Sequence, residues 1–295
     1  IRRPPRSTQG VSSAASDVYK RQVLGGLILT MAAIRMGGSA VTDLFMGTIA
    51  LDPFAQFFKV LILLSTVLVI LMSFKTDELK NYSVGEYFSI LAIMALGLFL
   101  MASSIDILMV YLSLEIVSIM SFFLAGYLKK SQLSNEAALK YVIYGAFSSG
   151  IMLFGFSILF GLTGSTKFFE IRQALAGLEN GANLALIISA VFILAGFGYK
   201  ISAVPFHFWT PDVYEGSPTT ITAYLSIAPK AAGFAMLIRF FNQVMGDGTA
   251  MINDSWSALG SLPWPQLMGV LACLLYTSDA ADDTPCVDLG GRRII

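Results

Sequence analysis

Six long apolar segments run through this 295-residue chain, and each contains 18 to 27 residues. A helix that crosses a bilayer needs about 20 apolar residues. Only 13% of the residues are charged, whereas a soluble domain usually carries about 25%. The sequence therefore predicts an all-α fold, a polytopic membrane helix bundle, with spans at 54–74, 86–103, 105–127, 136–162, 184–209 and 218–243. Between the spans we expect loops, which are short and polar at 75–85, 128–135 and 210–217 and longer at 163–183 and 244–264.

The two ends of the chain differ from this apolar middle. Residues 1–22 hold five Lys or Arg against one acidic residue, and neither they nor 273–295 continue the apolar pattern. Both resemble translated sequencing-adaptor read-through, a kind of segment that is set aside in fold reasoning. The alternative is a disordered basic head and an ordinary soluble tail. We expect two non-native tails, 1–22 and 273–295, around a transmembrane domain at 23–272 that is a fragment of a longer subunit.

The inventory of ligand-forming residues is small. The chain has two cysteines, Cys273 and Cys286, and one histidine, His207. This set does not support a metal cluster, a haem attachment or a disulfide framework. No glycine-rich phosphate-binding motif follows a strand. We therefore expect no cofactor and no metal in this chain.

Three charged residues lie deep inside apolar segments: Glu115 in 105–127, Lys200 in 184–209 and Lys230 in 218–243. An ionisable group at the centre of a spanning helix costs about 2.5–3.5 kcal/mol even on lenient scales. Burial and a nearby carboxylate act in opposite directions on the proton affinity of a lysine. A change in the distance between Glu115 and Lys200 would therefore decide whether the lysine keeps its proton. The pattern predicts a proton relay, with water between its stations.

Two further residues are weaker candidates for the relay. Lys140 lies five residues into 136–162, so its ammonium could also extend to the membrane surface. His207 is a plausible bridge because histidine is a residue type that exchanges protons in many proteins, although a lone histidine can equally be a structural hydrogen-bonding group. Four acidic residues near helix ends are expected to cap helices or lie in solvated loops: Asp52, Asp106, Asp212 and Glu215.

Two prolines adjoin the intramembrane lysines. Pro205 lies five residues after Lys200, and Pro229 directly precedes Lys230. Because proline has no N–H, each interrupts the helical hydrogen bonds and frees a carbonyl one turn earlier, near Ile201 and Leu225. Broken backbone at membrane depth is tolerated where it is buried in protein or lines a wet cavity. A simple packing kink is the alternative.

Several stretches of this sequence resemble a known family. They are YKISAVPFHFWTPDVYEGSPTTITAYLSIAPK at 199–230, YLSLEIVSIMSFFLAGY at 111–127, NEAALKYVIYGAFSSGIMLFG at 135–155 and LDPFAQFFKVLILL at 51–64. They look like the proton-pumping, antiporter-like subunits of respiratory complex I (NADH:quinone oxidoreductase). The PDVYEGSP form and the lysine of Ala-Pro-Lys resemble the N-subunit branch, called subunit 2 in mitochondria. The likeness covers about 23–272.

The resemblance implies a particular architecture. The family has about fourteen transmembrane helices that contain two inverted five-helix repeats, each with a broken helix. By position, 86–244 would be the complete first repeat, and the second would be missing. Five residues match relay positions of the family: Glu115, Lys140, Lys200, His207 and Lys230. The lysine of the second repeat has no counterpart, and this departure puts autonomous pumping in doubt.

The resemblance also implies a function. We expect a proton-translocating subunit of NADH:quinone oxidoreductase, without a redox centre of its own, in a bacterial inner membrane or an organellar one. Its partners would be the lipid bilayer, protons and the other complex I membrane subunits, with no nucleic acid. Flavin, iron–sulfur clusters and quinone would belong to those other subunits. The alternatives are an Mrp-type cation/proton antiporter subunit and a non-transporting membrane scaffold.

Overall fold

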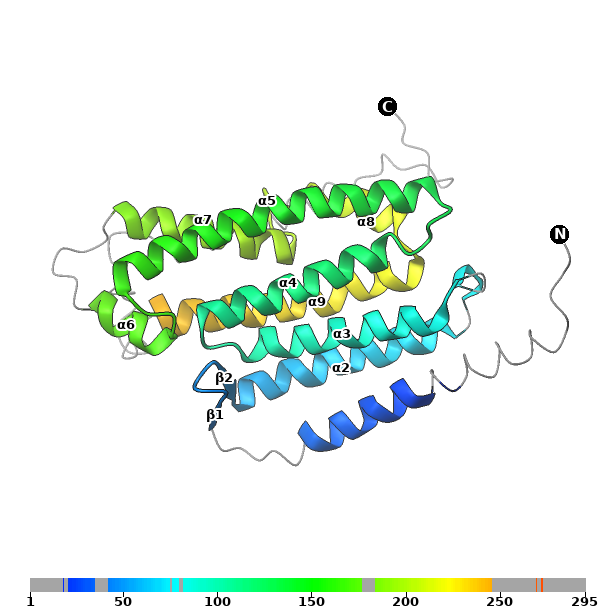
Figure 1. Ribbon diagram of the computed structural model, residues 1–295, viewed down its shortest axis with the longest axis horizontal. Coiled ribbons are helices and arrows are strands. Elements are labelled where there is room, and N and C mark those ends of the chain that lie inside the picture. Colours follow the sequence, from blue (N-terminus) through cyan, green and yellow to red (C-terminus); the bar gives the residue numbers. More distant parts are fainter. Residues whose placement is uncertain are drawn as a thin grey trace, which may run out of the picture.

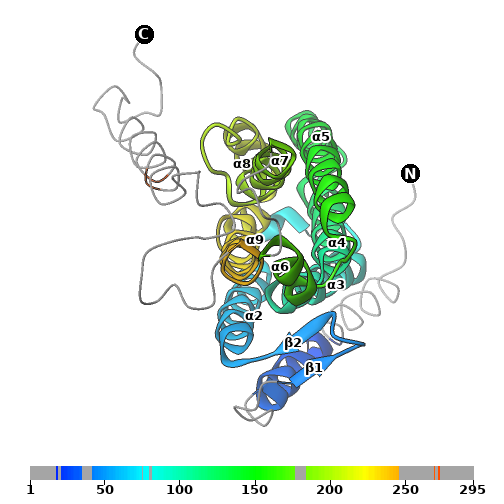
Figure 2. The same cartoon turned by 90° about the vertical axis from the view of Figure 1, so that its left-hand side faces the viewer.

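The computed structural model describes residues 21–34, 42–74, 76–79, 82–176 and 184–245, together with Val18, Gly269 and Ala272. Most of the expected tails 1–22 and 273–295 lie outside these residues, as does most of the expected loop 244–264. The described part is a bundle of long helices that run along one common direction (Figure 1). Figure 2 looks along this direction and shows α9 surrounded by the other helices. The predicted all-α membrane bundle is confirmed.

Six helices in the described residues are long and apolar enough to cross a membrane. They are α2 (Pro53–Ser73), α3 (Val84–Ser103), α4 (Ile107–Ala125), α5 (Gln132–Thr163), α7 (Leu184–Ile201) and α9 (Thr219–Phe240), which continues as the π-helix η2 (Phe241–Met245). A shorter apolar helix covers Arg21–Ile34. The smaller elements are the hairpin strands β1 (Thr42–Leu44) and β2 (Ile49–Leu51), the 3₁₀-helix η1 (Asp77–Leu79), α6 (Phe168–Ala176) and α8 (Thr210–Gly216).

Side chains at the helix starts explain several of these boundaries. Asp52 accepts a hydrogen bond from the Ala55 amide at 2.7 Å, and a proline follows it at the first helical position of α2. Asp106 accepts from the Leu108 amide at 2.8 Å and so caps α4. Such caps satisfy amides that have no carbonyl within the helix. The predicted capping roles of Asp52 and Asp106 are confirmed.

The largest difference from the sequence prediction concerns 184–209, which is not one interrupted span. Helix α7 ends at Ile201, before Pro205, because Ser202 adopts a left-handed backbone with φ +59°. The Ser202 amide donates to the Tyr199 carbonyl at 3.1 Å, and the Ala203 amide donates to the Gly198 carbonyl at 2.7 Å. This pair of bonds is the Schellman ending of a helix. The carbonyls of the last turn are thus bonded by the turn itself.

Three other predictions were wrong in detail. The expected loop 210–217 is mostly the short helix α8, and the expected loop 163–183 contains α6. Pro229 does not break α9, because the helix continues through it to Phe240. Proline 229 removes one hydrogen-bond donor but leaves the path of the chain helical.

Helices α5 and α7 pack closely because small residues lie between them. A Cβ atom on Gly155 would lie 2.9 Å from the carbonyl oxygen of Ser189, closer than real Cβ contacts. The Ser189 hydroxyl in turn donates to the Gly155 carbonyl at 2.7 Å. Small residues and interhelical hydrogen bonds are the usual means of packing helices in membranes.

Hydroxyl groups join α9 to α2 and α3. The Tyr224 hydroxyl hydrogen-bonds Thr66 of α2 at 2.9 Å, and Tyr87 of α3 hydrogen-bonds Thr220 at 2.9 Å. All four side chains are buried. The first half of α9 is therefore fixed laterally by polar contacts with two neighbouring helices.

Candidate proton-relay site

Lys200 lies in the last turn of α7 and is only 2% exposed. Its ammonium donates a hydrogen bond to the Ser118 hydroxyl of α4 at 3.1 Å. The Ser118 hydroxyl donates in turn to the Leu114 carbonyl at 2.8 Å. Gly233 of α9 also lies against this region, since a Cβ there would be 2.8 Å from Ile201. The lysine is therefore enclosed between α4, α7 and α9.

Glu115 lies one turn before Ser118 on α4, and its carboxylate interacts electrostatically with the Lys200 ammonium. The two groups form no direct ion pair within 4.0 Å in the described part of the chain. Glu115 Oε1 is buried and has no hydrogen-bond partner among the described residues. The structure thus places Glu115 and Lys200 near Ser118 and near one another, without a direct ion pair between them.

Lys230 follows Pro229 in the middle of α9, and its ammonium lies 5.6 Å from the centre of the Tyr214 ring. An ammonium at this distance from an aromatic face is attracted to the ring. Tyr214 belongs to α8, the helix that follows the turn after Lys200. This turn and α8 therefore connect the two lysines along the chain.

The turn between α7 and α8 is held against α5 by Trp209. The Trp209 ring stacks on Tyr141 of α5, with centroids 4.6 Å apart and planes at 11°. Its indole N–H donates to the Tyr199 carbonyl at 3.2 Å. His207 lies in the same turn, stacked on Phe208 at 4.9 Å, and its Nδ1 is buried without a hydrogen-bond partner among the described residues.

Lys140 lies near the end of the bundle where α5 begins, and its side chain is 37% exposed. It forms ion pairs with Glu136 at 2.8 Å and with Asp212 of α8 at 2.6 Å. Asp212 thus has a specific partner in addition to the helix-end position expected for it. This geometry fits the alternative in which the lysine extends to the membrane surface, and the structure does not place Lys140 in contact with Glu115 or Lys200.

In the described part of the chain, buried polar atoms without a hydrogen-bond partner are concentrated in the segment that follows α7 and precedes α9. Within the described residues, the buried side-chain atoms without a hydrogen-bond partner in this segment are Ser202 Oγ, His207 Nδ1, Thr210 Oγ1, Tyr214 OH and Ser217 Oγ. Buried polar groups in native proteins are nearly always bonded to protein or to ordered water. Water is therefore the natural partner for these atoms, and a chain of waters and hydroxyls can conduct protons.

Tyr214 is suited to such a chain because it stays neutral. Burial raises the pKa of the Tyr214 phenol to about 12. At physiological pH the hydroxyl is therefore protonated, and it can donate one hydrogen bond while it accepts another.

Comparison with known proteins identifies the family. The family model described as NADH:quinone oxidoreductase/Mrp antiporter, TM, matches residues 104–278, which is more than half of the chain. The chain belongs to this family. The predicted resemblance to complex I membrane subunits is thereby confirmed. Together with the six apolar helices, this membership makes the chain a multi-pass protein of the inner membrane.

Individual relatives of this chain belong to the same kind of subunit. It is 52% identical to NADH-quinone oxidoreductase subunit N 2 of Chloroherpeton thalassium over 75% of this chain and 44% of the relative. It is 44% identical to subunit N of Anaeromyxobacter sp. over 79% of this chain and 46% of the relative. The chain thus spans about half the length of these curated relatives.

Solved structures show the same fold. A chain of respiratory complex I from Thermus thermophilus matches with a TM-score of 0.64 and 30% identity, over 78% of this chain and 51% of that chain. The Mrp complex from Dietzia sp. matches with a TM-score of 0.62 at 20% identity, over 80% of this chain and 46% of that one. The second likeness concerns the fold alone.

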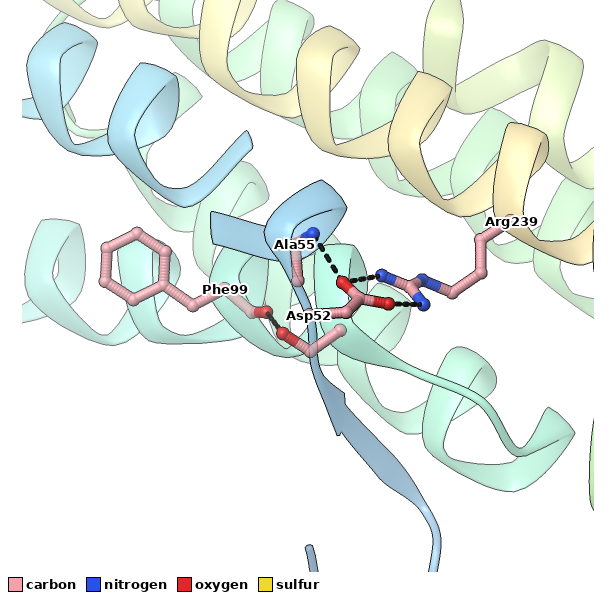
Figure 3. Close-up of polar contacts among 5 residues, drawn as sticks. Asp52, Ala55, Phe99 and Arg239 are labelled. Carbon is pink, nitrogen blue, oxygen red and sulfur yellow. Dashed lines mark hydrogen bonds and ion pairs between the residues drawn. The ribbon is translucent and has the colours of Figure 1, made fainter. Parts of the chain in front are cut away.

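The sequence did not predict an ion pair that joins the end of α9 to the start of α2. The Arg239 guanidinium of α9 contacts both carboxylate oxygens of Asp52, Nη1 to Oδ2 at 2.6 Å and Nη2 to Oδ1 at 2.8 Å (Figure 3). The arginine side chain is 2% exposed and the aspartate side chain 16%. The sequence pattern did not single out Arg239, because it lies near the end of its apolar segment. Its position in an otherwise apolar helix, with an aspartate opening another span, was the signal available.

The Asp52 carboxyl allows a prediction about pH. Burial raises its pKa, but hydrogen bonds from Arg239 and the Ala55 amide and the positive charges of Arg239 and Lys59 outweigh burial, so the pKa lies below its ordinary value of 3.8. A lowered folded-state pKa adds stability above the ordinary value, and this contribution is lost as pH falls through the folded value.

We therefore expect the difference in thermal unfolding midpoint between the native protein and Asp52→Asn to be constant near neutrality and to shrink below about pH 3.8. Thermal unfolding of the detergent-solubilised protein at a series of pH values measures this difference. A difference that does not change with pH would contradict the assignment.

Proposed function

We propose that this chain is part of a proton-translocating membrane subunit of an NADH:quinone oxidoreductase. The observation that carries the proposal is the enclosed Lys200 ammonium, bonded to Ser118 and near a carboxylate with an unpartnered oxygen, beside a segment of unsatisfied polar atoms. Intramembrane ionisable residues of this kind mark ion or proton pathways. The relatives named as subunit N support the assignment to this enzyme.

The Glu115 carboxylate favours the protonated form of Lys200 while the two groups are near one another. A small movement of α4 relative to α7 would weaken this attraction and leave a cation buried at 2% exposure. The lysine would then release its proton, because an uncompensated buried charge is costly. The Glu115–Lys200 pair is in this way a switch that responds to conformational change.

The released proton has a path along the turn and α8 towards Lys230. His207 and Tyr214 are the proposed stations, together with the hydroxyls of Ser202, Thr210 and Ser217, with water between them. Lys230 would receive the proton beside the Tyr214 ring. Lys140 and its acidic partners would exchange protons with the aqueous phase at the same end of the bundle.

Redox chemistry would take place elsewhere in the enzyme. We propose that flavin, iron–sulfur clusters and quinone are held by partner subunits, and that this chain contacts other complex I membrane subunits. The described residues contain no group of three or more His, Cys, Asp or Glu able to hold a metal ion. We propose that the coupling to quinone reduction is conformational and electrostatic.

The test is Glu115→Gln in a complete complex, with NADH oxidation, quinone reduction and proton pumping measured in parallel. The amide keeps the shape of the side chain and removes its charge, so we expect pumping to fall at least about 100-fold, the lower end of the range for a lost proton-transfer group. Glu86→Gln is the matched control, because Glu86 is exposed in the first turn of α3.

Three outcomes separate the alternatives. Pumping that collapses in an assembled complex supports the relay. Unchanged pumping contradicts it and favours a structural role for the buried charges. Sodium or potassium movement coupled to counterflow of protons would favour an Mrp-type antiporter subunit instead.

A further inference from the structure

The contact between Asp52 and Arg239, here called the Asp52–Arg239 clamp, fixes the guanidinium on more than one side. Besides the two bonds to Asp52, the guanidinium lies 5.0 Å from the centre of the Phe54 ring. Asp52 itself is held in place by the Ala55 amide, as Figure 3 shows. A planar guanidinium bonded through two N–H groups to one carboxylate has a defined direction as well as a defined distance. The clamp therefore orients the end of α9 relative to the start of α2.

Helix α9 lacks one backbone hydrogen bond directly before Lys230. Pro229 has no N–H, so the carbonyl of Leu225 lacks its usual donor within the helix. Sharp bends in helices occur at such positions. The position of the Lys230 ammonium therefore depends on how the two halves of α9 are held.

The two halves are held by different kinds of contact. The half before Pro229 is bonded to α2 and α3 through Tyr224 and Thr220. In the half after Pro229, Phe240 packs edge-on against the Phe168 and Phe197 rings at 5.5 and 5.6 Å. Ring contacts of this kind are not directional bonds, whereas the two N–H bonds of the clamp fix both a distance and a direction.

We propose that Asp52 and Arg239 are positioning residues for Lys230: the clamp fixes the second half of α9 on α2 and thereby sets where the Lys230 ammonium lies. The functional meaning of this position rests on the proposed relay role of Lys230. Figure 1 shows that the start of α2 and the end of α9, which the clamp joins, lie at the opposite end of the bundle to the start of α5 and to α8. The clamp would thus link the position of Lys230 to structural changes where α9 ends and α2 begins.

The test measures the surroundings of position 230 directly. Lys230→Cys is introduced into the complete complex, and its rate of reaction with a water-soluble maleimide is measured with Arg239 intact and with Arg239→Gln. We expect labelling to become about tenfold faster in the second case, because position 230 is half-buried and the labelling of such a thiol rises with the population of opened states. The chain's own two cysteines give a background, which is subtracted with the same complexes lacking Lys230→Cys.

The control is Glu170→Gln, which removes an exposed ion pair with Lys167 (3.8 Å) and should leave the labelling rate unchanged. A change confined to the neighbourhood of Arg239 would not alter position 230, so equal labelling rates with and without Arg239→Gln would overturn the proposal. Arg239→Lys keeps a cation but loses the two-pronged contact, and it serves where Arg239→Gln fails to assemble. Unchanged labelling there would overturn the proposal equally.

The outcome is separable from that of the proposed function. If labelling at position 230 responds to the clamp while Lys230→Met pumps normally, the positioning role stands and the relay role of Lys230 fails. If Lys230→Met stops pumping but labelling ignores the clamp, the relay stands and the positioning role fails.

Discussion

A complete complex that carries Lys200→Met is expected to assemble but to pump protons at least about 100-fold more slowly, the lower end of the range for loss of a proton-transfer group. Methionine fills the space of the lysine chain without a charge. Because Lys200 is only 2% exposed and enclosed by three helices, bulk water cannot replace its ammonium. We expect quinone reduction to fall with pumping, since the two are coupled.

The matched control for this experiment is Lys167→Met. Lys167 is 47% exposed and pairs only weakly with Glu170, at 3.8 Å, so its loss should leave pumping unchanged. NADH oxidation with an artificial electron acceptor shows in each case whether the redox subunits remain intact. Normal pumping by an assembled Lys200→Met complex would show that the buried charges are structural and that the relay mechanism is wrong.

The membrane spans could be predicted because their lengths are set by local composition. The expected segments 54–74 and 105–127 differ from α2 (Pro53–Ser73) and α4 (Ile107–Ala125) by one or two residues at each end. Apolar length alone carries this information, because the hydrocarbon thickness fixes the length of a helix. Asp52 and Asp106 could also be assigned as caps from their position before an apolar run.

The end of α7 could not be predicted from the same signal. The turn at 202–209 is itself largely apolar, with Ala203 and Trp209 buried. A hydrophobic run does not distinguish a helix from a buried turn. The left-handed Ser202 that ends the helix has no signature of its own, because glycine is the usual residue at such a position.

Contacts between segments that are far apart along the chain also could not be predicted from the sequence. Glu115, Lys200 and Lys230 could be picked out individually by the cost of burying a charge. Ser118 as the acceptor for Lys200, and Tyr214 as the ring beside Lys230, depend on how helices pack. The clamp joins residues 187 positions apart, and a single sequence gives no measure of such a distance.

Substitution of Asp52 by asparagine is expected to destabilise the protein by about 3–5 kcal/mol, the usual cost of removing one member of a buried ion pair. Asparagine can still accept the Ala55 amide, so the cap of α2 is retained. The guanidinium of Arg239, however, is left at 2% exposure without its counter-ion. Lys59, which interacts electrostatically with Arg239, adds repulsion.

Arg239→Gln should cost less than Asp52→Asn, because the carboxylate that remains is 16% exposed and can be solvated. The double variant should also be more stable than Asp52→Asn alone, since it leaves no uncompensated charge at this site. These three proteins and the native form make a double-mutant cycle, in which residues in contact give a coupling of about 0.5–3 kcal/mol. The midpoint of thermal unfolding of the solubilised complex ranks them. If the two single variants are equally stable and their effects simply add, the ion pair contributes nothing, and helix α9 is held by its apolar contacts alone.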